Sequence, residues 1–236
     1  WMIKSFGSKV YTGGPFTSIG GQTRFHFAQI DSSSGLANSW NPLIEDTPTA
    51  VFDDGTDVIL AGDTSVVGVN YRESLAAVTI ASGTLSTWNP NPVFWNRNEW
   101  EPELSYISKI IFSGSSLYVA GRFITINGVS KGNLAAFDST GAMTAWGASA
   151  NYAVFNMVED ATNLFLSGWF TTLNGSGRAG MGGVLKSTGA ITSWAPTVDS
   201  VYEMAVAGTS VMISGWFTTI NGTTREGFGS VDTSTG

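Results

Sequence analysis

The sequence contains no cysteine, a single histidine (His26) and few charged residues, which make up 12% of its 236 positions. Without cysteine the chain can form no disulfide, thiol nucleophile or thiolate metal site. Any Ser-His-Asp triad would have to use His26, and no acid is placed to orient it. No apolar run approaches the roughly 18 residues that a membrane-spanning helix needs. These absences leave few routes to catalysis and argue against membrane insertion.

The charge that is present is acidic, with a formal net charge of -7. Nucleic-acid backbones and anionic membranes select basic surfaces, so neither is expected as a partner. The sequence is rich in glycine, with 29 residues, and contains 9 tryptophans. Many small polar residues between short apolar runs indicate a rigid β protein rather than a disordered chain.

One short phrase occurs five times: an apolar run that ends in glycine. Its last glycines are Gly14, Gly62, Gly121, Gly168 and Gly215, so the steps are 48, 59, 47 and 47 residues. A fixed period of this size indicates a stacked or radial repeat. Two other markers recur in phase with the glycines. They are a tryptophan (Trp40, Trp88, Trp146 and Trp194) and a basic residue (Arg24, Arg72, Lys131, Arg178 and Arg225).

Each unit of about 47 residues contains four short β-rich runs joined by turn signals. The turns include Asn127-Gly128, Asn174-Gly175 and Asn221-Gly222, a strong hairpin signal because both residues accept positive φ. No helical periodicity appears. This pattern predicts an all-β fold, a β-propeller of five four-stranded repeat units that forms a single domain over residues 1–236. The predicted units are 1–42, 43–90, 103–148, 149–196 and 197–236.

The fifth unit stops before the tryptophan-bearing run that ends the others, so it is predicted to be incomplete. An open blade exposes a strand edge, which proteins tend to avoid. We therefore expect the sequence to be part of a larger ring or of a longer chain.

The repeat resembles the kelch and galactose-oxidase-like propellers, and more closely a group of bacterial secreted and surface propeller repeats of unassigned function. The resemblance rests on Gly-x-Phe-x-Thr-x-Asn-Gly at 121–128, 168–175 and 215–222, and on Thr-Gly-x-x-x-x-Trp at 140–146 and 188–194. It implies a propeller fold and an extracellular or cell-surface setting. It implies no activity, because such folds host many functions.

An insertion at 89–102 lengthens one connection by about 11 residues relative to its equivalents. It carries Trp95, Arg97 and Trp100, which could form a sugar- or peptide-binding surface, since loops on rigid scaffolds often carry function. The alternative is that the tryptophans fill a gap at the rim or contact a neighbouring chain.

The residue type that follows the repeated glycine differs from unit to unit, which indicates that packing constrains this position little. It holds Trp169 and Trp216 in the last two units. Two interpretations remain open for these tryptophans: a solvent-facing stacking platform for sugar rings, or burial between repeats.

Acidic residues offer two weaker candidates. Asp53-Asp54-Gly55-Thr56-Asp57 resembles a calcium loop but lacks the distant glutamate, so an ordinary turn is expected and no metal or cofactor is predicted. Glu99, Glu101 and Glu103 could supply the acids of a glycoside hydrolase.

His26 aligns with serine, asparagine and glycine in the other units, which suggests a tolerant surface position.

These observations favour a non-enzymatic binding or structural scaffold module of an extracellular surface, an appendage or a virion. The alternatives are a glycan-binding lectin and a glycoside hydrolase-type enzyme. The expected partners are other protein subunits or neighbouring domains, together with glycans, and not nucleic acid.

Overall fold

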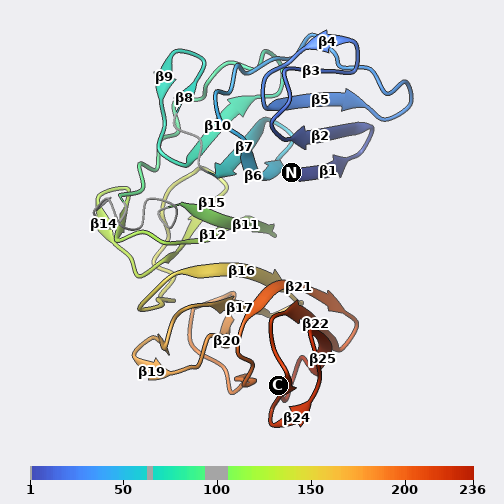
Figure 1. The fold of residues 1–236 in the computed structure, drawn as a ribbon. Helices are drawn as coiled ribbons and strands as arrows, with labels where there is room; N and C mark the ends of the chain where they lie inside the picture. The colour runs from blue at the N-terminus through green and yellow to red at the C-terminus, as the bar shows by residue number, and fades with distance from the viewer. Residues whose placement is uncertain (1, 63–65, 94–105) are drawn as a thin grey trace, which may run out of the picture. The chain divides into compact units, whose positions relative to one another are not determined.

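The computed structural model describes residues 2–62, 66–93 and 106–236 (Figure 1). Every regular element in these ranges is a β-strand, which confirms the predicted all-β class. No helix in this part of the chain could cross a membrane. The residues fall into two compact units. Unit 1 runs to Val93 and adds Tyr106–Ile110 and Ile126–Val129; the described part of unit 2 is Ile111–Thr125 and Ser130–Gly236.

Five small antiparallel sheets of three strands follow one another along the described chain, and in each the second strand in sequence lies in the middle. The first contains β1 (Met2–Phe6), β2 (Lys9–Gly13) and β5 (Phe27–Asp31), and the second contains β6 (Pro48–Asp53), β7 (Asp57–Gly62) and β10 (Leu75–Thr79). The third contains β11 (Ile107–Ser113), β12 (Ser116–Gly121) and β15 (Leu134–Asp138). The fourth contains β16 (Val154–Glu159), β17 (Asn163–Gly168) and β20 (Met181–Leu185), and the fifth β21 (Val201–Ala207), β22 (Ser210–Gly215) and β25 (Phe228–Asp232).

A two-stranded hairpin connects the middle and third strands of every sheet. The hairpins are β3–β4 (Ser18–Ile19, Gln22–Thr23), β8–β9 (Val66–Val67, Asn70–Tyr71), β13–β14 (Thr125–Ile126, Val129–Ser130), β18–β19 (Thr172–Leu173, Ser176–Gly177) and β23–β24 (Thr219–Ile220, Thr223–Thr224). The predicted Asn-Gly turns are confirmed: Asn174 and Gly175, for example, have φ values of 47° and 77°. The Asn174 side chain also accepts a bond from Ser149 N and donates one to Gly189 O, which anchors the hairpin.

The prediction of four-stranded units needs correction, because the fourth segment is not a regular strand. It pairs with the third strand over only a few residues, through an isolated bridge such as Val184 to Ile191 and backbone bonds such as Thr192 N to Gly183 O at 2.9 Å. Few residues separate the preceding turn from Pro196, which has no N–H to donate to a ladder. A side-chain bond supplements the pairing, since Arg178 Nη2 donates to Thr192 O at 2.9 Å. Arg24 and Lys131 bind the carbonyls of Asn38 and Trp146 in the same way, which gives the repeated basic residue a structural role.

The interpretation of His26 as a tolerant surface position is wrong. His26 has a φ of 59°, and its equivalents Ser74, Asn133, Gly180 and Gly227 all have φ between 56° and 75°. Ser74 and Asn133 are also buried. The position is therefore defined by a left-handed backbone, which asparagine and glycine adopt most readily.

Unit 1 is held together by an apolar cluster and a buried polar network. Tyr11, Phe27, Trp40 and Leu60 belong to the cluster. The Tyr11 hydroxyl donates to Asp53 Oδ2 at 2.7 Å and Lys9 Nζ lies 3.1 Å from the same oxygen. Burial, and then the bond to Asp53, raises the pKa of Tyr11. Burial alone would raise the pKa of Asp53, but the hydrogen bonds from Tyr11, Gly55 and Lys9 outweigh it, so this pKa lies below its usual value.

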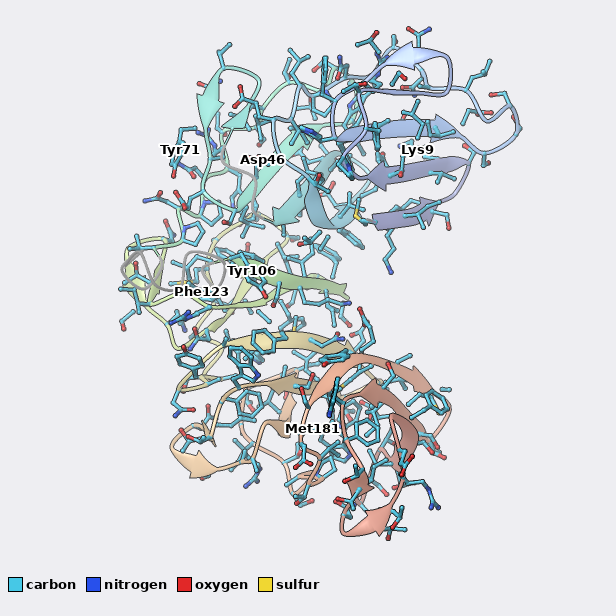
Figure 2. All side chains as sticks on the ribbon, in the orientation of Figure 1. Lys9, Asp46, Tyr71, Tyr106, Phe123 and Met181 are labelled. Carbon is cyan, nitrogen blue, oxygen red and sulfur yellow. The ribbon has the colours of Figure 1, made fainter. Side chains whose placement is uncertain are left out.

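Unit 2 contains two apolar clusters, one around Leu164 and Leu166 and one around Phe165 and Val211. Met181, labelled in Figure 2, belongs to the second. The repeated tryptophans connect successive repeats: Trp146 Nε1 donates to Leu185 O and Trp194 Nε1 to Asp232 O, at 3.0 and 2.9 Å. In unit 1, Trp40 Nε1 donates to Thr79 O at 3.0 Å. Trp40, Trp146 and Trp194 thus each donate a hydrogen bond to the following repeat.

Candidate functional site

Part of the predicted site falls outside the described residues. Trp95, Arg97 and Trp100 of the insertion lie there, as do Glu99, Glu101 and Glu103. The described candidates are Trp169 and Trp216, both in unit 2. The site is therefore built from these two side chains.

Trp169 and Trp216 both face solvent, with 55% and 78% of their surface exposed. Each follows a glycine that ends a middle strand, and each precedes a buried phenylalanine, Phe170 or Phe217. Gly168 passes so close to the start of β16 that a Cβ there would lie 2.2 Å from Ala153 O. Trp169 N then donates to that same oxygen at 2.9 Å. The exposure of both side chains contradicts the interpretation of burial between repeats.

Each of the two repeats also has a β-bulge at an aromatic residue of its first strand. In the pairing of β16 with β17 the register shifts between Val154 and Asn156, so Phe155 is the extra residue. The same shift between Val201 and Glu203 makes Tyr202 the extra residue of β21. Bulges redirect a side chain out of the normal alternation of a strand. Phe155 meets Trp169 edge to face, with ring centroids 4.9 Å apart, and Tyr202 is 63% exposed.

Hydrogen bonds connect the two bulges of unit 2. The Asn156 side chain donates to Glu203 Oε2 at 2.8 Å and to Tyr202 O at 3.4 Å, so the bulge of β16 adjoins the bulge of β21. Tyr152, which precedes β16 in the sequence, lies under the Arg122 guanidinium, 4.7 Å from its ring centre. We call the following residues the aromatic row: Tyr152, Phe155, Trp169, Tyr202 and Trp216.

Hydrogen bonds within turns lower the pKa values of Asp31, Asp138 and Asp232. Bonds from Ser33 and Ser34 lower the pKa of Asp31 to about 2, and equivalent bonds from Thr140 and Ser234 lower those of Asp138 and Asp232. Each of these carboxylates accepts backbone N–H groups of the turn after a third strand, so the bonds stabilise the turn.

The calcium-like segment behaves as the expected turn. Asp53 Oδ1 accepts a bond from Gly55 N, and Asp54 Oδ1 accepts bonds from Thr56 N and Asp57 N, at 2.7 to 2.9 Å. Within the described residues, no three His, Cys, Asp or Glu side chains gather closely enough to hold a metal ion.

A hollow of about 400 Å³ in unit 2 is lined by Tyr118, Trp146 and Lys186, among others. Its polar groups already have protein partners. The Tyr118 hydroxyl donates to Lys186 O at 2.8 Å, and Lys186 Nζ bonds to Ser113, Glu159 and Asp160 O. The hollow therefore presents few free groups to a ligand.

Sequence reasoning missed Tyr152, Phe155 and Tyr202. A signal was present, because Phe155 and Tyr202 are equivalent positions, 47 residues apart, as are Trp169 and Trp216. Their shared direction depends on the bulge, which a strand pattern with a period of two does not reveal.

No protein-family model matches the chain, and no curated protein matches it in sequence. Among solved structures, the chain is similar to the computationally designed Ika8 protein, with a TM-score of 0.58 and 11% identity over 99% of the chain. The chain spans 58% of the length of that protein. It also matches BamB from Moraxella catarrhalis with a TM-score of 0.44 and 12% identity, over 87% of this chain and 70% of BamB. The likeness to Ika8 is one of fold alone, and the succession of small antiparallel sheets shows this chain to be an all-β protein.

Proposed function

We propose that this chain is a non-enzymatic binding module that presents the aromatic row to a partner. The observation that carries the proposal is the exposure of Trp169 and Trp216 at equivalent places in successive repeats. Tryptophan buries much apolar area on contact and is enriched where proteins bind ligands. A rigid scaffold with exposed aromatic side chains at one edge suits binding better than chemistry.

The proposal extends to the architecture and the setting. We take the successive sheets as blades of a kelch-like β-propeller of five repeat units. We place the module at an extracellular surface, in an appendage or in a virion, where other subunits or neighbouring domains would adjoin it. This part of the proposal is supported by the repeat pattern of the sequence.

The proposal is tested by comparing the wild-type chain with a variant that carries both Trp169→Ala and Trp216→Ala. Both are screened against a displayed peptide library and a glycan array, and self-association is measured by sedimentation. We expect the wild type to bind in one assay and the variant to lose that binding while keeping the same thermal midpoint. If no assay separates the two proteins, or if the purified chain turns over a substrate, the proposal is wrong.

A further inference from the structure

The apolar surface of unit 2 differs in chemistry from that of unit 1. Among the described residues of unit 2, the large apolar side chains that are exposed are all aromatic: Trp169, Tyr202, Trp216 and Phe228. In unit 1 most of them are aliphatic: Ile3, Leu36, Leu43, Val69, Val93 and Val129, with Phe25 and Tyr71. Aromatic side chains offer flat faces on which the rings of a ligand can stack.

Trp169 is held in place before any ligand arrives. Its backbone N–H is bonded to Ala153 O, and the edge-to-face contact with Phe155 restricts its ring. More than half of its surface nevertheless remains open. A restricted ring with an open face loses little conformational freedom on binding, which favours a ligand that covers one face.

Polar residues lie close in sequence to the aromatic ones. Asp199 and Thr218 are exposed, and Asp199 occupies the place in its repeat that Tyr152 occupies beside Arg122. Glu203, which accepts the bond from Asn156, lies next to Tyr202. Carboxylates and hydroxyls beside an aromatic face can accept and donate bonds to the hydroxyls of a sugar ring. Their acidic character, with the net charge of -7, disfavours an anionic ligand.

We infer that the ligand of the aromatic row is a neutral oligosaccharide of pyranose rings. One ring stacks on Trp169 and another ring of the same chain stacks on Trp216. This inference rests on the proposed function and names the ligand class of the same site. The two tryptophans belong to successive repeats of one protein. An oligosaccharide that reaches both of them therefore binds more tightly than a monosaccharide, which reaches only one.

The experiment titrates the wild-type chain with defined glucose, N-acetylglucosamine and mannose oligomers of one to six units, by calorimetry and tryptophan fluorescence. We expect one series to bind, with affinity that rises with length until both rings are engaged. Trp169→Ala and Trp216→Ala should each weaken the longest oligomer by roughly tenfold, which is the loss of one stacking contact. Each should also abolish the dependence on length.

The matched control is Tyr71→Ala, because Tyr71 is an exposed aromatic residue of unit 1 outside the aromatic row. It should bind as the wild type does. The inference is overturned if no oligomer in the three series binds, or if both tryptophan variants keep the affinity and length dependence of the wild type. If those glycans fail while the double variant loses a peptide or self-association, the carbohydrate inference falls and the binding function stands.

Discussion

At the scale of the residue, backbone conformation explains positions that composition leaves obscure. His26, Ser74, Asn133, Gly180 and Gly227 differ in size and polarity, yet all have a left-handed backbone. This left-handed conformation costs a non-glycine residue about 1 to 2 kcal/mol. Two hydrogen bonds of the Asn133 side chain offset part of this cost, since it accepts a bond from Phe123 N and donates one to Ala150 O.

His26 provides a direct test of this explanation. We expect His26→Gly to raise the free energy of unfolding by about 0.5 to 1 kcal/mol, because glycine adopts positive φ without steric conflict. His26→Val should lower it by about 1 kcal/mol or more, because a β-branched residue is poorly tolerated there. Urea denaturation measures both changes. Equal stability of the two variants would restore the interpretation of a tolerant surface position.

The repeated glycine is required for space at Gly168. An added Cβ would lie 2.2 Å from Ala153 O and 2.8 Å from the Cα of Val154, both of which are backbone atoms. Gly168→Ala should therefore destabilise the protein by about 2 to 3 kcal/mol. The control is Gly177→Ala, where a Cβ meets no atom within 4 Å, and it should change stability by less than about 0.5 kcal/mol. A Gly168→Ala protein with the wild-type melting curve would contradict the close approach.

At the scale of the element, local chemistry predicted the hairpins well. Asn-Gly needs only its own two residues to adopt positive φ, so the turns at Asn127, Asn174 and Asn221 could be predicted without knowledge of the neighbours. The bulges at Phe155 and Tyr202 could not be predicted, because they depend on how two strands align. The fourth segment was predicted as a strand because its composition suits one, but it pairs with the third strand over only a few residues.

The third strands allow a matched comparison between two repeats. Met181 on β20 and Phe228 on β25 occupy equivalent positions, but Met181 is 1% exposed and Phe228 is 59% exposed. Met181→Ala should cost about 2 to 5 kcal/mol of stability through the cavity that it leaves. Phe228→Ala, measured on the same chain by the same denaturation, should cost less than about 0.5 kcal/mol. Similar losses in both variants would mean that Phe228 is covered in solution.

At the scale of the whole molecule, the turn carboxylates make stability depend on pH. Hydrogen bonds from Ser33 and Ser34 hold the pKa of Asp31 at about 2, against an ordinary value of 3.8, and the pKa values of Asp138 and Asp232 are also lowered. A carboxylate with a lowered pKa contributes stability above its unfolded pKa and loses it as the pH falls through the folded one.

We therefore expect the urea midpoint to stay level down to about pH 4 and to fall steadily towards pH 2. Asp31→Asn should lower stability at pH 5 and reduce the slope below pH 4, because its side chain no longer titrates. Denaturation curves between pH 2 and pH 6 measure both effects. If the urea midpoint of the variant falls with pH as steeply as that of the wild type, groups other than Asp31 cause the acid sensitivity.

The sequence by itself determined the all-β class, the repeat of about 47 residues, the Asn-Gly hairpins and the positions of the tryptophan and basic markers. These follow from local turn chemistry and from spacing, which the chain carries before it folds. Only the tertiary structure decided that Trp169 and Trp216 are exposed, that Phe155 contacts Trp169 and that Asn156 binds the backbone of Tyr202. The physical reason is that exposure depends on strand register and on close backbone approach between separate segments. Composition and repeat period predict neither the close approach of Gly168 to Ala153 nor the hydrogen bond from Asn156 to Tyr202.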